Sequence, residues 1–372
     1  MAGRGGGGRL TRSAPTVRQL TVPQALELAR AGHRLVDVRE TWEWRAGHVA
    51  GATHIPLGEL PSRLAAELPD RDRPVVLYCR SGARSGRAAL YLAANGYRDV
   101  ANVDDLIERW PQLGGAWEAD GEGLSAAQRR RYARQLSLSE VGEWGQARLL
   151  AAKVLLIGAG GLGSPVALYL AAAGIGTMGL VDDDVVDESN LQRQVAHTTE
   201  RIGHPKTASA RAAVEALNPD VQVVEHRLRL TAENADALVS GYDVIVDGTD
   251  NFATRYALND AAVRLRRPVV HASAYRWEGE VTTLVPFDGP CYRCLHPSQP
   301  PDELAPDCAV AGVLGVLPGI LGTIQAAEVL KLVLGSGETL FGRLLLVDAS
   351  TAEFREVRVE RDPACPACGE QR

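Results

Sequence analysis

The stretch Val154-Leu-Leu-Ile157-Gly158-Ala-Gly160-Gly161-Leu-Gly163 lies near the middle of this 372-residue sequence. It joins an apolar, strand-like run to a glycine-rich turn, and the apolar helical pattern from Ser164 to Ala173 follows directly. Glycines permit a tight turn and a close approach of the backbone, and the N-terminus of a helix attracts phosphate. The stretch therefore predicts a strand, a phosphate-binding turn and a helix. Taken alone, it suits an NAD-dependent dehydrogenase as well as any other nucleotide-binding protein.

The sequence around this turn predicts an α/β fold. Strand-like runs at Met178-Gly-Leu-Val181 and Val244-Ile-Val-Asp247 alternate with Ala-rich helical patterns. Such alternation is typical of a mostly parallel sheet that helices cover on both faces. This larger unit is expected to span residues 125–372, and to open with one charged helix that contains Arg129-Arg-Arg-Tyr-Ala-Arg134.

A second, smaller α/β unit is expected upstream, over residues 15–113. Its strand-like runs include Arg34-Leu-Val-Asp-Val38 and Pro74-Val-Val-Leu-Tyr78. The Gly-rich run that follows predicts a polar linker at residues 114–124, and residues 1–14 are expected to form a disordered tail.

The composition excludes several classes of protein. A net charge of −6 gives no electrostatic basis for binding nucleic acid or an anionic membrane. Residues 1–9 lack the apolar core of a signal peptide, so the six cysteines are expected in a reducing compartment, the cytoplasm. The apolar stretch 309–334 carries Gln325, Glu328 and Lys331 besides a proline, which favours a buried helix over a membrane span.

The smaller unit contains a candidate nucleophile. Cys79 follows the strand-like run 74–78 and precedes the apolar helical pattern 88–93. This order places the cysteine at a helix N-terminus, where backbone N–H groups and the helix dipole stabilise a thiolate, and Arg80 and Arg84 would add positive charge. Such a thiolate can carry a persulfide. An isolated cysteine would be a core residue, but the flanking Gly and Arg residues favour the catalytic interpretation.

These segments resemble the rhodanese family of sulfurtransferases. The resemblance rests on Asp37-Val-Arg39-Glu40, on Gly47-His48-Val-Ala-Gly51-Ala-Thr-His54-Ile-Pro56 and on the loop Cys79-Arg-Ser-Gly-Ala-Arg84-Ser85. It implies that Cys79 carries the persulfide. A phosphatase with a Cys-x5-Arg loop is the chemical alternative, but only four residues separate Cys79 from Arg84. The tighter loop suits a sulfur atom better than a phosphate.

Further polar residues follow the strands of the larger unit. Asp182 ends the strand after the glycine turn, where an acidic residue can accept hydrogen bonds from ribose hydroxyls. Asn190, Arg193 and Lys206 come next along the chain, and Asp250 follows the last of the quoted strands. Two cations and an acid around a phosphate-binding turn fit phosphate chemistry, with a metal–triphosphate complex near the acid, better than hydride transfer.

In this order the motifs resemble the family of adenylyltransferases for molybdopterin synthase and thiamine biosynthesis (MoeB/ThiF), relatives of the ubiquitin-activating enzymes. The resemblance runs from about Ser125 to the C-terminus and implies a Rossmann-like fold that binds ATP and Mg²⁺. It implies that Asp182 holds the ribose and Asp250 the magnesium ion. Arg134 would reach the triphosphate from the partner subunit, so a homodimer is expected. The implied nucleotide-binding residues are Gly158, Gly160, Gly161, Gly163, Asp182, Asn190, Arg193, Lys206 and Asp250.

Two Cys-x-x-Cys pairs, Cys291 with Cys294 and Cys365 with Cys368, point to a metal. Four thiolates in two matched pairs are typical of a closed, tetrahedral Zn²⁺ site, which is structural because no ligand position stays open. A redox pair is the alternative, and the presence of two matched pairs disfavours it. The metal would tie the C-terminal segment to the rest of the larger unit.

The remaining cysteine, Cys308, follows the Pro- and acid-rich segment 299–307. This segment is expected to form an exposed crossover loop near the nucleotide. Two roles stay open for the cysteine: a catalytic one, through a covalent bond with a carrier protein or as a reducing thiol, and a packing role in the core.

Together the resemblances imply that ATP activates the Gly-Gly C-terminus of a ubiquitin-like sulfur-carrier protein, and that the rhodanese-like unit supplies sulfur from a cysteine desulfurase or another donor. The carrier of molybdopterin synthase is favoured. Carriers for thiamine, cysteine or tRNA thiolation are alternatives, as is a rhodanese unit that only docks partners. The implied catalytic residues are Cys79, Arg80, Arg84, Arg134, Arg193, Lys206, Asp250 and Cys308.

Overall fold

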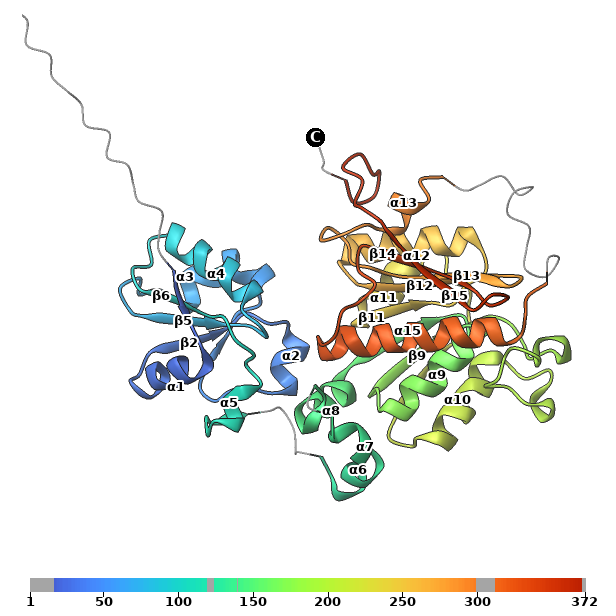
Figure 1. Cartoon of the computed structure of the whole chain (residues 1–372), viewed down its shortest axis with the longest axis horizontal. Coiled ribbons are helices and arrows are strands. Elements are labelled where there is room, and N and C mark those ends of the chain that lie inside the picture. Colours follow the sequence, from blue (N-terminus) through green and yellow to red (C-terminus); the bar gives the residue numbers. More distant parts are fainter. Residues whose placement is uncertain (1–16, 119–123, 139, 299–311, 370–372) are drawn as a thin grey trace, which may run out of the picture. The chain divides into compact units, whose positions relative to one another are not determined.

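The computed structural model describes residues 17–118, 124–138, 140–298 and 312–369. The chain divides into two compact units, Met1–Gly123 and Leu124–Arg372 (Figure 1). Each unit has its own sheet and its own buried core. The α/β class that the sequence predicts is confirmed in both.

A parallel sheet forms the centre of the smaller unit. In spatial order its strands are β1 (Arg18–Leu20), β6 (Val100–Val103), β5 (Val75–Tyr78), β2 (Arg34–Asp37) and β4 (Thr53–His54). Alternate residues of a strand point to opposite faces, so Val36 and Leu77 belong to one core and Leu35 and Val76 to the other.

Helices cover both faces of this sheet. The first face packs against α3 (Leu60–Glu67) and α4 (Ala83–Ala94), and the second against α1 (Val22–Arg30) and α5 (Arg109–Gln112). The short helix α2 (Thr41–Ala46) and the 3-10 turn η1 (Leu57–Glu59) lie in the connections after β2 and β4.

An antiparallel strand pair joins β3 (His48–Val49) to β7 (Trp117–Glu118). β7 lies within residues 114–124, where the sequence predicted a linker. Trp117 explains why: the Arg39 guanidinium lies over its ring, 5.8 Å from the centroid, and the ring fills the space that a side chain at Gly47 would occupy. The beginning of the expected linker is therefore part of the smaller unit.

The larger unit contains an eight-stranded sheet. Five neighbouring strands run parallel, and a tight hairpin after the fifth reverses the chain and starts an antiparallel extension. In spatial order the strands are β10 (Gln222–His226), β9 (Thr177–Val181), β8 (Lys153–Ile157), β11 (Val244–Asp247), β12 (Val269–Tyr275), β13 (Glu278–Leu284), β14 (Arg343–Asp348) and β15 (Glu353–Arg358). The sheet is thus mostly parallel, as predicted.

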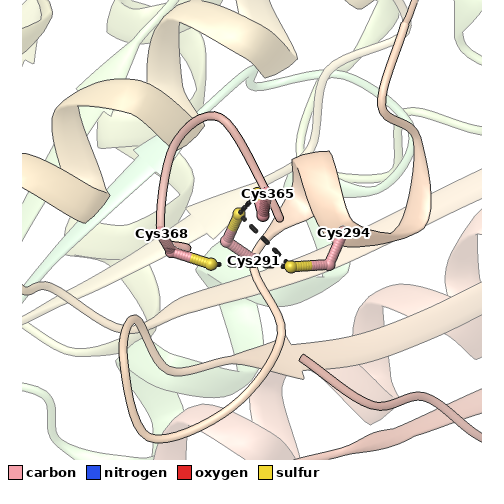
Figure 2. Close-up of side chains that lie close together, drawn as sticks. All are labelled: Cys291, Cys294, Cys365 and Cys368. Atoms are coloured by element: carbon pink, nitrogen blue, oxygen red, sulfur yellow. Dashed lines mark hydrogen bonds between the residues drawn. The ribbon is translucent and has the colours of Figure 1, made fainter. Parts of the chain in front are cut away.

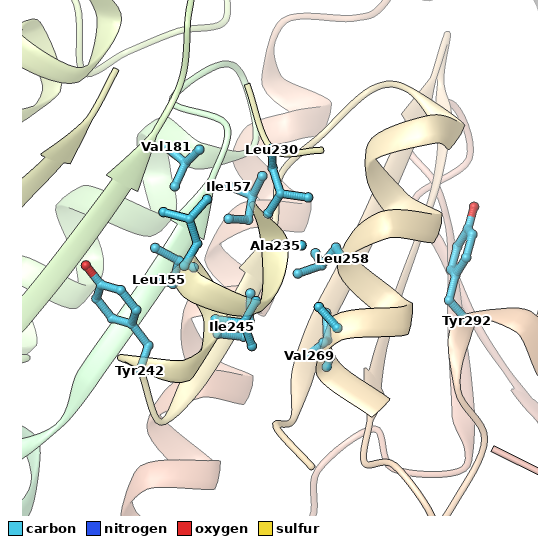
Figure 3. Packing of buried hydrophobic residues seen from close by; sticks show 14 of the residues in the cluster. Leu155, Ile157, Val181, Leu230, Ala235, Tyr242, Ile245, Leu258, Val269 and Tyr292 are labelled. Atoms are coloured by element: carbon cyan, nitrogen blue, oxygen red, sulfur yellow. The ribbon is translucent and has the colours of Figure 1, made fainter. Parts of the chain in front are cut away.

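Helices also cover both faces of the larger sheet. Figure 3 shows one core, in which Leu155, Ile245 and Val269 of the sheet meet Leu258 of α12 (Phe252–Leu265) and Ala235 of α11 (Ala235–Ser240). The other face packs against α9 (Gly163–Ala173), α10 (Lys206–Leu217) and α15 (Val316–Leu334). Other short elements of this unit include α8 (Gly142–Ala151), α13 (Tyr292–Leu295) and the 3-10 turns η2 (Glu188–Asn190) and η3 (Thr199–Arg201).

The charged segment that opens the larger unit is not one helix, as the sequence suggested, but two. α6 (Ala126–Arg131) and α7 (Ala133–Leu136) meet at Tyr132, whose ψ of 11° interrupts the helix. Tyr132 is buried, and its hydroxyl accepts a hydrogen bond from Asn218 at 2.9 Å. The break therefore lets one aromatic side chain of a polar segment reach the core.

α15 is long and apolar enough to cross a membrane by length and composition, and half of its most apolar window is buried within the unit. Its two buried polar residues bind other elements: Gln325 donates to the carbonyl oxygens of Asp247 and Val270, and Glu328 accepts from Thr283. This is the behaviour of a core helix, as the polar residues in its sequence predicted.

Candidate functional site

The glycine turn between β8 and α9 requires glycine at both ends. Gly158 has a φ of +92°, and a Cβ there would lie 2.8 Å from the carbonyl oxygen of Gly248. A Cβ on Gly163 would lie only 1.9 Å from the carbonyl oxygen of Gly158. The chain folds tightly on itself here, so α9 begins directly beside the turn and directs its free N–H groups toward whatever binds there.

Asp182 lies at the carboxyl end of β9, beside this turn. One of its carboxylate oxygens accepts a hydrogen bond from the backbone N–H of Ala159 at 2.8 Å, and the other accepts from Asp184 N–H at 2.9 Å. These bonds fix the carboxylate at the edge of the sheet, where a ribose would meet it.

A pocket lies at the carboxyl ends of β8, β9 and β11, which is where open α/β sheets bind ligands. Most of the predicted nucleotide-binding residues line it: Gly158, Gly160, Gly161, Asp182, Arg193, Lys206 and Asp250. The other two lie outside the lining. Gly163 packs against Gly158, and Asn190 accepts a hydrogen bond from Arg193 at 2.7 Å.

Both predicted cations of the pocket already have acceptors. The Lys206 ammonium lies 2.8 Å from a carboxylate oxygen of Asp184, and the lysine side chain is 8% exposed. Arg193 donates to the Asn190 amide oxygen. Each cation is therefore held at the wall of the pocket, where a triphosphate would compete for it with a partly exposed protein acceptor.

Several lining residues escaped the sequence analysis. These are chiefly Gln194, Arg229, Thr249, Arg255 and Pro318. Two of them could have been predicted from the sequence, because Gln194 is next to Arg193 and Thr249 is next to Asp250. Arg255 and Pro318 reach the pocket from α12 and α15, which only the tertiary structure brings together.

His197, which was not among the predicted site residues, contacts the glycine turn between β8 and α9. Its Nε2 lies 2.9 Å from the Ala159 carbonyl oxygen, which can only accept, so Nε2 carries the proton and Nδ1 accepts from the Ser209 hydroxyl at 2.9 Å. Burial lowers the pKa of His197, and the nearby Lys206 lowers it further. The neutral ring therefore holds the carbonyl side of the glycine turn.

Cys79 lies in the loop between β5 and α4. Its Sγ accepts hydrogen bonds from the backbone N–H of Gly82 and from the Ser85 hydroxyl, both at 3.2 Å. Gly82 has a φ of +93°, and a Cβ there would lie 2.4 Å from a carboxylate oxygen of Asp104. Because α4 begins only at Ala83, the cysteine lies at the base of the loop rather than in the first turn of the helix. Two hydrogen-bond donors therefore point at the sulfur atom.

The two arginines of this loop are both paired with carboxylates. Arg80 donates to Glu108 at 2.8 Å, and Arg84 donates to both oxygens of the buried Glu43. These ion pairs hold the positive charge of both guanidinium groups around the loop, and the charge of Arg84 acts on Cys79.

The four cysteines of the Cys-x-x-Cys pairs come together in the larger unit (Figure 2). Sγ–Sγ distances are 3.9 Å for Cys291–Cys294, 3.6 Å for Cys291–Cys365 and 3.5 Å for Cys294–Cys368. A tetrahedron with Zn–S bonds of about 2.3 Å has edges of about 3.8 Å, so the cluster fits Zn²⁺. Burial raises the pKa of Cys291, and it raises that of Cys368 to about 11, so a bound metal would have to displace their protons.

Two predicted residues fall outside these clusters. Arg134 is exposed on α7 and does not line the pocket at the carboxyl ends of β8, β9 and β11. Cys308 and the segment around it lie outside the described residues.

A family model described as the ThiF family matches residues 132–367, more than half of the chain. The chain belongs to the ThiF family. A second model, described as a rhodanese-like domain, matches residues 21–112. Both resemblances drawn from the sequence are confirmed, and the chain joins a rhodanese-like domain to a ThiF domain.

Named relatives and solved structures agree with this assignment. The sulfur carrier protein adenylyltransferase of Thermus thermophilus is 51% identical over 246 residues, 65% of this chain and 91% of that protein. The adenylyltransferase and sulfurtransferase MOCS3 of Bos taurus is 51% identical over 249 residues, and the match spans about half of that protein (55%) and 67% of this chain. A crystal structure of Escherichia coli MccB with ATP shares the fold, with a TM-score of 0.56 at 24% identity over 64% of this chain and 74% of that one.

Proposed function

We propose that this protein adenylates the C-terminal glycine of a ubiquitin-like sulfur-carrier protein with ATP and then transfers sulfur to it from a Cys79 persulfide. The observation that carries the proposal is the pairing, in one chain, of a nucleotide pocket with a cysteine cradled by hydrogen-bond donors. The names of the relatives, a sulfur carrier protein adenylyltransferase and an adenylyltransferase and sulfurtransferase, support it.

In the first step, a carboxylate oxygen of the carrier attacks the α-phosphorus of ATP, and pyrophosphate leaves. Asp182 would hold the ribose, and the turn at Gly158–Gly161 would place backbone N–H groups against the phosphates. Arg193 and Lys206 would stabilise the negative charge that develops on the leaving group. Mg²⁺, held by Asp250, would neutralise further charge on the triphosphate.

Arg134 would complete this site from the partner subunit of a homodimer. Its exposure on α7, away from the pocket of its own chain, supports that assignment. The side chain would then reach the triphosphate of the neighbouring protomer and add a third cation.

In the second step, the persulfide on Cys79, formed by a cysteine desulfurase or another sulfane-sulfur donor, attacks the acyl carbon of the adenylate. The bond to AMP breaks, and an acyl disulfide joins the carrier to Cys79. A thiol then attacks the Cys79 sulfur atom and supplies the two electrons, so the S–S bond breaks, the carrier leaves as a thiocarboxylate, and a disulfide forms. Cys308 is the thiol that this chain offers for the step.

The carrier that we favour is the small subunit of molybdopterin synthase, in the cytoplasm. The fusion to a rhodanese-like domain and the sequence of the Cys308 segment support this branch. Carriers for thiamine, cysteine or tRNA thiolation form the alternative. In that case the rhodanese-like domain could serve mainly to dock partners, although the intact donors around Cys79 argue for catalysis.

The test is the intact mass of a carrier that ends in Gly-Gly, after incubation with the enzyme, Mg-ATP and a sulfur donor. The wild type should produce the thiocarboxylate, and Cys79→Ala should produce only the adenylate or its hydrolysis product. Equal thiocarboxylate formation by both proteins would exclude the sulfur-transfer role of Cys79. A carrier without AMP or sulfur in every reaction would contradict the choice of carrier, and several carriers failing alike would contradict adenylation.

A further inference from the structure

A buried pair of charged groups adjoins the nucleotide pocket, and the proposed chemistry leaves it without a role. Asp247 ends β11, and His271 lies opposite it in register on β12. The His271 Nδ1 lies 2.7 Å from a carboxylate oxygen of Asp247, and both side chains are at most 3% exposed. On the other side of the ring, Nε2 lies 3.7 Å from a carboxylate oxygen of Glu280 on β13.

The surroundings favour the charged form of both partners. Burial alone would lower the pKa of His271, but Asp247 and Glu280 outweigh it and raise that pKa. Burial would likewise raise the pKa of Asp247, but His271, Arg255 and Thr249 together outweigh it and lower that pKa. The Arg255 guanidinium of α12 lowers the pKa of His271, and His296, whose Nε2 lies 3.9 Å from the same Glu280 carboxylate, interacts electrostatically with the His271 ring. Tyr292 of α13 packs its ring 5.0 Å from the imidazole.

This network holds the turn that forms one wall of the pocket. The second carboxylate oxygen of Asp247 accepts from the backbone N–H of Thr249 at 3.0 Å and from the Thr249 hydroxyl at 2.7 Å. Arg255 donates to the Thr249 carbonyl oxygen at 2.8 Å. Thr249 is therefore fixed at three atoms, and both it and its neighbour Asp250 line the pocket.

We propose that His271 is a positioning residue for nucleotide binding: its charged ring orients the Asp247 carboxylate and thereby fixes the Gly248–Asp250 wall of the pocket. The inference rests on the proposed use of ATP and deepens it. When the ring loses its proton, Asp247 and Glu280 stay negative, and the Nε2 lone pair faces a carboxylate. The wall then loosens, and the net negative charge beside the triphosphate grows.

The affinity of the full-length protein for Mg-ATP tests this role, measured by titration calorimetry from neutral pH upward. In the wild type, the dissociation constant should rise as the pH passes the raised pKa of His271. His271→Asn keeps a donor for Asp247 but cannot carry the charge. This variant should bind more weakly at neutral pH, by a factor on the order of ten, which is typical of coupling through one buried pair. Its dissociation constant should also lack this increase at alkaline pH (the alkaline rise).

A second variant keeps the histidine and changes its environment. Glu280→Gln removes one of the two carboxylates that face the ring, so the pKa of His271 should fall and the alkaline rise should move to lower pH. An unchanged position of that rise would overturn the proposal. So would a His271→Asn protein that matches the wild type in affinity and in pH profile.

Asn218→Ser serves as the control for a general loss of stability. Asn218 is buried and donates to Tyr132 and to the Ala171 carbonyl oxygen, and none of these three residues lines the pocket. The variant should melt at a lower temperature and keep the wild-type affinity and pH profile; a matching loss of affinity would overturn the specific role of His271. Failure of the wild type itself to bind Mg-ATP at any pH would instead contradict the use of ATP, and this inference with it.

Discussion

Arg84 of α4 forms a two-point ion pair with Glu43 of α2, with distances of 2.5 Å from Nη1 to Oε2 and 2.9 Å from Nη2 to Oε1. The Glu43 side chain is 2% exposed. Burial alone would lower the pKa of Arg84, but Glu43 outweighs it and raises that pKa, and the charge of Cys79 acts in the same direction. Glu43 therefore decides where this permanent positive charge lies beside the cysteine loop.

Replacement of Glu43 by Gln should lower the stability of the smaller unit and slow the formation of a persulfide on Cys79. The variant keeps the shape but loses the charged acceptor, and hydrogen bonds to charged groups contribute about 1.5–3 kcal/mol. We expect a loss of about that size in the free energy of unfolding, measured with urea, and slower formation of the Cys79 persulfide, measured by mass spectrometry. The matched control is Glu67→Gln, whose pair with Arg63 is partly exposed on both sides. In this control, the free energy of unfolding should change by no more than about 0.5 kcal/mol.

Two glycines of the larger unit should respond oppositely to alanine. In Gly163→Ala, the new Cβ would lie 1.9 Å from the Gly158 carbonyl oxygen, so the turn must open and nucleotide binding should be lost. In Gly319→Ala, the Cβ meets nothing within 4 Å, and the position lies inside α15. Alanine is preferred to glycine in a helix by about 1 kcal/mol, so this variant should melt higher. Calorimetry measures the melting temperature of both variants, and titration measures their affinity for Mg-ATP. Normal nucleotide binding by Gly163→Ala would contradict the close contact between Gly163 and Gly158.

The cysteine cluster should hold one Zn²⁺ per chain, measured by elemental analysis of the purified protein. Cys365→Ser should remove most of the metal and lower the unfolding temperature of the larger unit, because a bound metal stabilises the state that binds it. Cys79→Ser should keep the metal, since Cys79 belongs to the other unit. Full zinc content in the Cys365 variant would contradict the four-cysteine site.

The stability of the larger unit should depend on the protonation of His197. Its pKa is lowered in the folded protein, mainly by burial, and returns to about 6.5 in the unfolded chain. Between the lowered value and about 6.5, only the unfolded chain binds the proton, so stability should fall as the pH falls through this window. His197→Asn should show a flatter dependence of the unfolding free energy on pH. Parallel curves for the two proteins would assign the acid sensitivity to other groups.

The sequence predicted those parts of the molecule whose interactions are local. Glycines directly after the run Val154–Ile157 specified a strand, a turn and a helix, and β8 and α9 follow that pattern closely. Cys79 was found in the same way, since its two donors, Gly82 and Ser85, lie within six residues of it. The four clustered cysteines were recognisable because each pair repeats the same short spacing.

Partners that lie far apart in the chain could not be predicted. Nothing in the sequence indicated that Arg84 is paired, because Glu43, its acceptor, lies 41 residues away on another helix. His271 belongs to no recognisable motif. Only the pairing of β11 with β12 places it opposite Asp247. Tyr132 broke a helix that local charge patterns favoured because its ring is buried in the core of the unit. Burial and long-range pairing decided each of these cases.

The spacing of the four clustered cysteines also has a consequence for biosynthesis. Cys291 and Cys365 are 74 positions apart, and β14 and β15 lie between them in the sequence. As the chain emerges from the ribosome, its first Cys-x-x-Cys pair is therefore complete well before the second pair has been translated. Domains generally fold as units, and the N-terminal domain folds first during synthesis. A metal ion that needs all four cysteines can therefore bind only after the second pair, close to the end of the ThiF domain, has been translated.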